Sequence, residues 1–319
     1  MSAADDTLLV QEIAPRDGLQ IEPGWIETDR KVALIDELSD CGFTRIEAGS
    51  FVSPKAIPML RDGGEVFARI RRRPGCLYVA LVPNMKGAER AIAAGVDELN
   101  LVVSASETHN GANMRMSTDS SFEAFARIAE VASGTGVRLN GTVATAFGCP
   151  FEGSITDKRV ISFAERYLAL GITNVTLADT TGMADPRLVS ERTGHVLRLV
   201  PTTGLTLHFH NTRGLGLANV LAGFQAGARR FDASLGGLGG CPFAPGATGN
   251  ICTEDLVHMC HAMGIPTGID LDRLLTLSRS LPALLGHDVP GQVAKAGPVW
   301  DLHPAPASAK VAPGACGTA

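Results

Sequence analysis

A regular alternation of short apolar runs with longer helical patterns constrains the fold of this chain more than any other feature. The eight apolar runs are rich in β-branched residues and lie at 8–13, 44–48, 77–82, 98–103, 137–143, 174–179, 205–210 and 230–234. Each run is followed by a segment long enough for a crossover helix, which indicates βαβ units and a parallel sheet. About eight such units favour a closed sheet over an open one. We therefore predict an α/β fold of the TIM (β/α)₈ barrel class.

The helical pattern is clearest in four segments, at 28–41, 119–133, 156–170 and 185–200. Thr156 and Asp185 stand where N-cap residues of the last two helices belong, and Pro186 suits a first helical position. Two more helical patterns, near 251–263 and at 270–285, follow the eighth strand. The second of them, at 270–285, predicts a short C-terminal helical piece that closes or extends the barrel.

We expect residues 1–300 to form one barrel domain that includes these C-terminal helices. Residues 301–319 are rich in Pro, Ala and Gly, which is typical of a tail without fixed structure. The chain has seven cysteines, an odd number, and no CxxC pair, so we expect mostly reduced thiols. The sequence assigns no role to Cys316 in the tail.

Composition and charge exclude several classes of protein. With 45% hydrophobic and 19% charged residues, the 319-residue chain can build a large core and is neither disordered nor fibrous. A net charge of −5, with no dense basic run beyond 71–73, argues against nucleic acid as a partner. Asp5 and Asp6 stand where a targeting peptide needs basic residues, and no apolar run approaches ~18 residues. We expect a cytoplasmic protein that binds no membrane.

The run at 205–210 contains the clearest candidate for a metal site. Apolar and polar residues alternate along it, so His208 and His210 share one face of the strand. In barrel enzymes the reactive residues lie at the carboxyl ends of strands, and two imidazoles two residues apart can bind one metal ion. The alternative is a pair of hydrogen-bonded core histidines.

Polar residues also follow the first strand, where Glu12 precedes Arg16 and Asp17. A carboxylate from Asp17 beside two imidazoles would suit Mg²⁺ or Mn²⁺. Arg16 offers a fixed fork of donors for an oxyanion or a carboxylate. The alternative is a simple turn, in which Asp17 caps backbone groups and Gly18 supplies a positive φ.

Two more acids end predicted strands, Glu47 on the second and Asp179 on the sixth. Either acid could transfer protons, or form an ion pair that supports Arg16. After the eighth strand, the glycine-rich segment 236–250 predicts a mobile lid with Cys241 at its centre. No GK[ST] follows the glycines, so a Walker-type phosphate site is disfavoured, and an inert buried thiol is the alternative for Cys241.

Seven segments carry a closer resemblance to a known family. They are Glu12 with PRDGLQ (15–20), IEAGSFVSPK (46–55), GCPFEG (148–153), ADTTG (178–182), HFH (208–210), GGLGGCPFAPGATGN (236–250) and TEDLVHM (253–259). Together they resemble the 3-hydroxy-3-methylglutaryl-CoA (HMG-CoA) lyase family, from about residue 8 to 295. The glycine-rich segment is the most specific of these signatures.

The resemblance implies a divalent-metal-dependent carbon–carbon lyase that cleaves the acyl-CoA thioester HMG-CoA to acetoacetate and acetyl-CoA by retro-Claisen chemistry. It implies four ligands for Mg²⁺ or Mn²⁺, namely Asp17, His208, His210 and Asn250. By the same resemblance, Arg16 would stabilise the enolate of acetyl-CoA, and Cys241 would handle its proton. The family's remaining acid and base residues correspond to Glu47, Asp179 and Glu254, with Glu12 supporting them.

Three departures from the family pattern leave the substrate open. Residues 211–214 read Asn-Thr-Arg-Gly where the family usually reads Asp-Thr-Tyr-Gly, Pro23 replaces a usual lysine, and SASETHNGANM (104–114) replaces the usual loop. We therefore expect Asn211 and Arg213, together with Arg16, to bind the substrate.

Three alternatives to HMG-CoA cleavage follow. The chain could cleave another branched hydroxyacyl-CoA, such as citramalyl-CoA or 3-methylmalyl-CoA. It could run the reaction as a Claisen-type condensation, although no separate regulatory domain is visible after residue 300. It could also bind a metal or CoA without turnover, which the intact set of candidate residues disfavours. For any of these functions we expect a homo-oligomer, a dimer or a tetramer.

Overall fold

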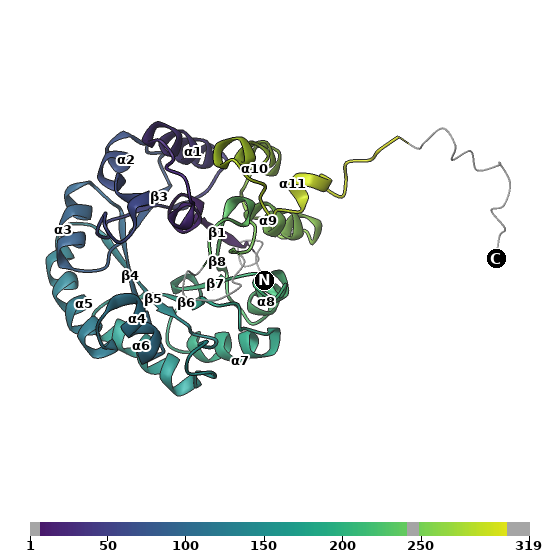
Figure 1. The fold of residues 1–319 in the computed structure, drawn as a ribbon. Coiled ribbons are helices and arrows are strands. Elements are labelled where there is room, and N and C mark those ends of the chain that lie inside the picture. The colour runs from purple at the N-terminus through teal and green to yellow at the C-terminus, as the bar shows by residue number, and fades with distance from the viewer. Residues whose placement is uncertain (1–6, 241–248, 305–319) are drawn as a thin grey trace, which may run out of the picture.

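All eight predicted strands are present and pair in sequence order, and β8 returns to β1, so that the sheet closes (Figure 1). The strands are β1 (Leu9–Glu12), β2 (Arg45–Ser50), β3 (Leu77–Leu81), β4 (Glu98–Ser104), β5 (Arg138–Ala144), β6 (Asn174–Asp179), β7 (Leu205–Phe209) and β8 (Arg230–Ala233). Every neighbouring pair is parallel. The computed structural model describes residues 7–240 and 249–304, and it confirms the predicted barrel.

Helices form an outer ring around the barrel, and the short helix α11 lies outside this ring (Figure 1). They are α1 (Thr28–Asp40), α2 (Gly63–Arg69), α3 (Met85–Ala93), α4 (Glu107–Met114), α5 (Thr118–Ala132), α6 (Asp157–Ala169), α7 (Pro186–Val196), α8 (Gly216–Gln225), α9 (Thr253–Ala262), α10 (Leu271–Leu285) and α11 (Val293–Ala296). The four clearest helical patterns of the sequence correspond to α1, α5, α6 and α7. The helices α10 and α11, which follow the last barrel helix α9, form the predicted C-terminal extension.

Two helices begin where the sequence predicts, because local side chains satisfy their first backbone N–H groups. The side chain of Thr156 accepts a hydrogen bond from the N–H of Arg159 at the start of α6. Asp185 accepts two such bonds at the start of α7, whose first residue is Pro186. An N-cap of this kind stabilises a helix by about 0.5–2 kcal/mol.

Three further predictions concern membrane-spanning helices, the basic run 71–73 and the C-terminal tail. Among the described residues, no helix is long and apolar enough to cross a membrane. In the segment 71–73, Arg71 pairs with Asp40 and Arg72 with Asp97 on the surface. Residues 305–319, which include Cys316, lie outside the described residues, so the predicted domain boundary after residue 300 stays a prediction.

A glycine in β5 lets a large aromatic residue pack directly on the sheet. Tyr167 of α6 is fully buried, and its hydroxyl donates to the carbonyl oxygens of Leu101 and Thr142 at 2.9 and 3.1 Å. A Cβ atom at Gly141 would lie 2.4 Å from a ring carbon of Tyr167. The packing of α6 on the barrel therefore requires glycine at this position.

We expect Gly141→Ala to lower the free energy of unfolding by about 1–3 kcal/mol, the usual cost of overpacking a core. Gly194→Ala in α7 is the matched control, because no atom lies within 4 Å of its added Cβ. Alanine is the better helix former, so the control should gain up to about 1 kcal/mol. Urea denaturation measures both changes, and equal stabilities of the two variants would contradict the prediction.

Candidate active site

Three potential metal ligands meet at the carboxyl end of the barrel. Asp17, His208 and His210 are buried, and their ligand atoms all lie within 4.8 Å of one another. Asp17 belongs to a short π-helical turn (Ala14–Gly18) after β1, while His208 lies in β7 and His210 directly follows that strand. The barrel therefore brings together residues that are almost 200 positions apart in the sequence.

Asn250 joins this cluster through backbone pairing that no local sequence pattern shows. It forms an isolated antiparallel bridge with His210. Its side-chain Nδ2 donates to Asp17 Oδ2 at 2.7 Å and to the carbonyl oxygen of Leu238 at 2.9 Å. Asn250 Oδ1 and His210 Nδ1 are buried and have no hydrogen-bond partner in the described part of the chain. Unpaired oxygen and nitrogen atoms beside a buried carboxylate fit a divalent cation.

The electrostatics of the cluster keep Asp17 and His210 in the forms that bind metal. Burial alone would raise the pKa of Asp17, but the charges of Arg16 and of the two histidines outweigh it and lower that pKa to about 2. Burial, followed by repulsion from His208, lowers the pKa of His210 to about 3. An ionised carboxylate and a neutral imidazole are the states that ligate metal ions.

Asp232 of β8 supports the first histidine from behind. The register places Asp232 beside His208, and its Oδ2 lies 3.3 Å from His208 Nδ1. Burial would lower the pKa of His208, but the hydrogen bond and charge of Asp232 outweigh it and raise that pKa. A carboxylate on one ring nitrogen orients the other nitrogen toward a metal. Sequence analysis missed Asp232, although its polar position next to the end of a strand was an available indication.

Arg16 is held by a column of polar side chains that runs into the barrel. Its guanidinium forms ion pairs with Asp17 and Glu47, and its Nε donates to Glu47 Oε2 at 2.6 Å. Asn100 of β4 donates to the other oxygen of Glu47 at 3.0 Å and accepts from Thr142 of β5 at 2.7 Å. This column fixes the direction of the Arg16 fork. Sequence reasoning found Arg16 and Glu47 but missed Asn100 and Thr142.

Two buried glutamates hold the start of the glycine-rich segment. The carboxylate of Glu12 accepts hydrogen bonds from the N–H groups of Ala14 and Leu235, at 2.8 and 2.9 Å. Glu254 accepts from the N–H of Gly236 at 3.0 Å. Burial raises the pKa of Glu12 to about 7, and it also raises the pKa of Glu254. Both side chains therefore bind the backbone that carries the segment.

Gly239 allows the glycine-rich segment to approach the metal ligands closely. It has a φ of +99°, and a Cβ there would lie 2.7 Å from Asn250 Nδ2 and 2.8 Å from the carbonyl oxygen of Asp17. Only glycine fits such a position without strain. Cys241 and the rest of 241–248 lie outside the described residues, so the lid and its thiol stay predictions.

The turn after β6 is anchored from two sides. Asp179 accepts two backbone N–H bonds from the turn 181–184, at 2.7 and 3.1 Å. Arg213 donates to two carbonyl oxygens of the same turn, at 3.0 and 2.7 Å. Burial raises the pKa of Asp179 to about 6, although the two N–H groups partly offset it. The side chain of Asn211 accepts a hydrogen bond from the N–H of Gly216 at the start of α8. This contact gives Asn211 a structural role, and its role in substrate binding stays a prediction.

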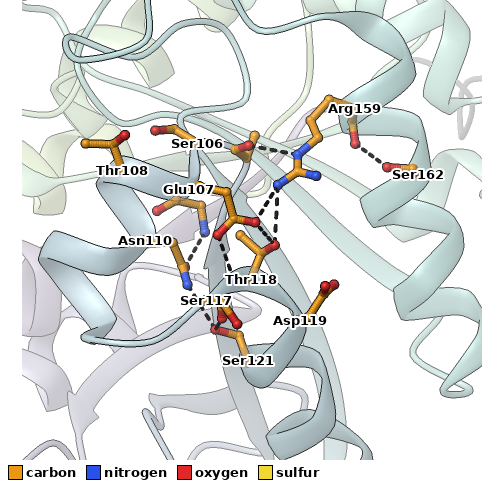
Figure 2. A network of polar contacts seen from close by, with 12 residues as sticks. Ser106, Glu107, Thr108, Asn110, Ser117, Thr118, Asp119, Ser121, Arg159 and Ser162 are labelled. Carbon is orange, nitrogen blue, oxygen red and sulfur yellow. Dashed lines mark hydrogen bonds and ion pairs between the residues drawn. The ribbon is translucent and has the colours of Figure 1, made fainter.

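The segment that departs from the family pattern, 104–114, contains the end of β4 and all of α4, and it has its own network of polar contacts. Figure 2 shows Glu107 between Thr118 and Arg159, and it accepts hydrogen bonds from both of them. Asn110 donates to the hydroxyl of Ser121 at 3.1 Å. These contacts tie α4 to α5 and α6, so the replacement loop has a fixed shape after the carboxyl end of β4.

A protein-family model matches the part of the chain that contains all of these site residues. The family model described as HMGL-like matches residues 8–281. The chain belongs to the HMGL-like family. The matched range includes every predicted catalytic, metal-binding and substrate-binding residue. Its relatives are named as lyases, and members of this family are carbon–carbon lyases, which confirms the family resemblance and the enzyme class that the sequence predicts.

Three relatives of this HMGL-like chain show how close the similarity is. The (R)-citramalyl-CoA lyase of Chloroflexus aurantiacus is 43% identical over 92% of this chain and 96% of its own length. The hydroxymethylglutaryl-CoA lyase of Bacillus subtilis is 41% identical over 89% of this chain and 95% of its own. An HMG-CoA lyase from Acinetobacter baumannii, solved in complex with coenzyme A and 3-methylmalate, is 65% identical with a TM-score of 0.94. It covers 96% of this chain and 100% of that one.

We expect Asp232→Asn to weaken Mn²⁺ binding about 10–100-fold, because the amide no longer orients and charges His208 as a carboxylate does. Isothermal titration calorimetry measures the affinity. Asp119→Asn on the surface is the matched control and should bind Mn²⁺ normally, whereas His210→Ala should lose binding. An unchanged affinity in a folded Asp232→Asn variant would mean that Asp232 does not support the metal site.

Proposed function

We propose that this chain is a divalent-metal-dependent lyase that cleaves HMG-CoA to acetoacetate and acetyl-CoA in the cytoplasm. The observation that carries the proposal is a buried set of oxygen and nitrogen ligands directly beside a fixed guanidinium. Retro-Claisen cleavage needs both parts. A tertiary alcohol must lose its proton, and a thioester enolate must be stabilised once the carbon–carbon bond breaks.

The metal part of the site is formed by Asp17, His208, His210 and Asn250. A divalent cation bound there, Mg²⁺ or Mn²⁺, would supply a Lewis acid that makes the hydroxyl proton of the substrate easier to remove. The donor set supports this role, because Asn250 Oδ1 and His210 Nδ1 have no other hydrogen-bond partner among the described residues. Asp232 keeps His208 oriented toward the same point.

The negative charge that forms on the substrate during cleavage is stabilised by side chains that the protein holds in place. Electrons of the broken bond pass to the thioester, whose oxygen becomes an enolate, and Arg16 is placed to donate to that oxygen. Asp179, with a pKa raised to about 6, is suited to accept the hydroxyl proton near neutral pH. The resemblance gives Cys241 the matching step, delivery of a proton to the enolate carbon.

The buried glutamates have a different part in this proposal. Glu47 positions the Arg16 fork. Glu12 holds the backbone N–H of Leu235, just before the glycine-rich segment, and Glu254 holds that of Gly236, its first residue. We therefore treat these three acids as positioning residues. Arg213 and Asn211 lie in the loop after β7, next to the second histidine, and Arg213 stays the candidate for reading the acyl group.

A lyase for citramalyl-CoA is the second candidate, and specific observations favour it. One relative that is 43% identical is named (R)-citramalyl-CoA lyase, and the 65% identical lyase was solved with the dicarboxylate 3-methylmalate. This chain also has Arg213 where the HMG-CoA lyase family usually has tyrosine. A guanidinium there adds a positive charge that could bind a second carboxylate.

A substrate panel tests the proposed reaction. Purified protein with Mg²⁺ or Mn²⁺ should convert HMG-CoA to acetoacetate and acetyl-CoA, identified by mass, with a higher kcat/KM than for citramalyl-CoA or 3-methylmalyl-CoA. A preference for citramalyl-CoA that Arg213→Tyr reverses would favour the second candidate. Turnover of none of these thioesters would refute the proposed function, and an unchanged preference in Arg213→Tyr would exclude Arg213 as the selecting residue.

Arg16 provides a sharper test of the mechanism. We expect Arg16→Lys to lower kcat about 10²–10³-fold, since lysine keeps the charge but loses the planar fork that Glu47 and Asp17 orient. KM should change less than kcat, because the enolate forms only in the transition state. Arg187→Lys, an exposed arginine of α7, is the control. A near-normal kcat in Arg16→Lys would show that charge alone suffices.

A further inference from the structure

The amino-terminal end of the barrel, opposite the candidate active site, contains a cavity of about 310 Å³. Three arginines line this cavity, and each is the first residue of its strand. They are Arg45 of β2, Arg138 of β5 and Arg230 of β8. Strands two, five and eight lie at well-separated places around the barrel. Three guanidinium groups therefore converge on one cavity from different sides.

The residues that the structure describes do not balance the positive charges that line this cavity. Arg45 forms a buried ion pair with Glu98, the first residue of β4, and its Nε also donates to Gln11. The side chains of Arg138 and Arg230 form no hydrogen bond or ion pair with any other residue that the structure describes. Among the described residues that line the cavity and their ion-pair partners, one carboxylate accompanies three guanidinium groups, an excess of two positive charges. Asp232 and Glu47, which do not line the cavity, also act on Arg45 through their charges.

This excess costs free energy in the folded chain. Arg230 is only partly exposed, and burial followed by repulsion from Arg138 lowers its pKa. Burial and repulsion from Arg230 likewise lower the pKa of Arg45 to about 10. A partly buried charge such as that of Arg230 is costly without a counter-charge, and a bound anion would reduce this cost. The cavity therefore favours an anionic ligand.

We propose that this cavity binds a phosphate-type dianion, held between Arg138 and Arg230 and bordered by Arg45. Two negative charges match the excess of two positive ones. Guanidinium forks also bind phosphate oxygens in pairs, and the cavity has room for such a group. The ligand would join β5 to β8 across the base of the barrel, far from the metal ligands at the other end. It would stabilise the fold without contacting the substrate.

Thermal unfolding with inorganic phosphate tests the proposal. The melting temperature Tm is measured against phosphate concentration, with sodium chloride keeping the ionic strength constant. We expect a saturable rise of about 2–4 °C, the shift that about 1 kcal/mol of ligand binding produces in a chain of this size. Arg138→Gln and Arg230→Gln should lose this rise. In chloride alone, Arg138→Gln should not lower the Tm, since its side chain has no contact to lose with the described residues and its removal relieves the repulsion of Arg230.

Two control variants separate this site from other anion sites. Arg187→Gln on the surface of α7 and Arg213→Gln at the carboxyl end of the barrel should both keep the full rise with phosphate. Even if Arg230→Gln does not fold, the exposed Arg138→Gln still decides the question. The proposal is wrong if phosphate gives no saturable rise, if Arg138→Gln keeps the rise or lowers the Tm in chloride alone, or if Arg213→Gln abolishes it.

Discussion

The buried carboxylate of Asp17 is the interaction on which the candidate active site depends. It pairs with Arg16, accepts from Asn250, and lies within reach of both histidines. Removing one partner of such a cluster would leave buried charges unpaired, which costs several kcal/mol. The same carboxylate therefore holds both the Arg16 guanidinium and the Asn250 amide in place beside the two histidines.

Around this centre, the protein uses carboxylates to fix geometry more than to carry out chemistry. Glu47 orients Arg16, Asp232 orients His208, and Glu12 holds the first residues after β8. Each acid satisfies donors that would otherwise be buried and unpaired, and an unpaired donor costs about 1–3 kcal/mol. A lyase site gains from this arrangement, because misplacing the fork or a ligand by about 1 Å can cost a hundredfold in rate.

The two ends of the barrel handle charge in opposite ways. At the carboxyl end, acids and bases are interleaved, and the ligand atoms that remain unpaired suit a cation. At the amino end, Arg45, Arg138 and Arg230 line one cavity, and Glu98 pairs with Arg45 alone among the described residues, which suits an anion. Strand direction separates these functions, because the first and last residues of parallel strands never meet. A ligand at the amino end can then change stability without changing the chemistry.

The sequence by itself determined the strands, the helix starts and the shared face of His208 and His210. These features depend on side-chain alternation and on cap residues such as Asp185, which act within a few positions of the chain. The family resemblance added Asn250, for which no local pattern exists. Only the tertiary structure placed Asn250 against Asp17, 233 residues away. It also placed Asp232 behind His208, and Asn100 beneath Glu47. Such pairs depend on how the strands align when the barrel closes, and that register is set by the packing of the whole sheet and not by neighbours in the sequence.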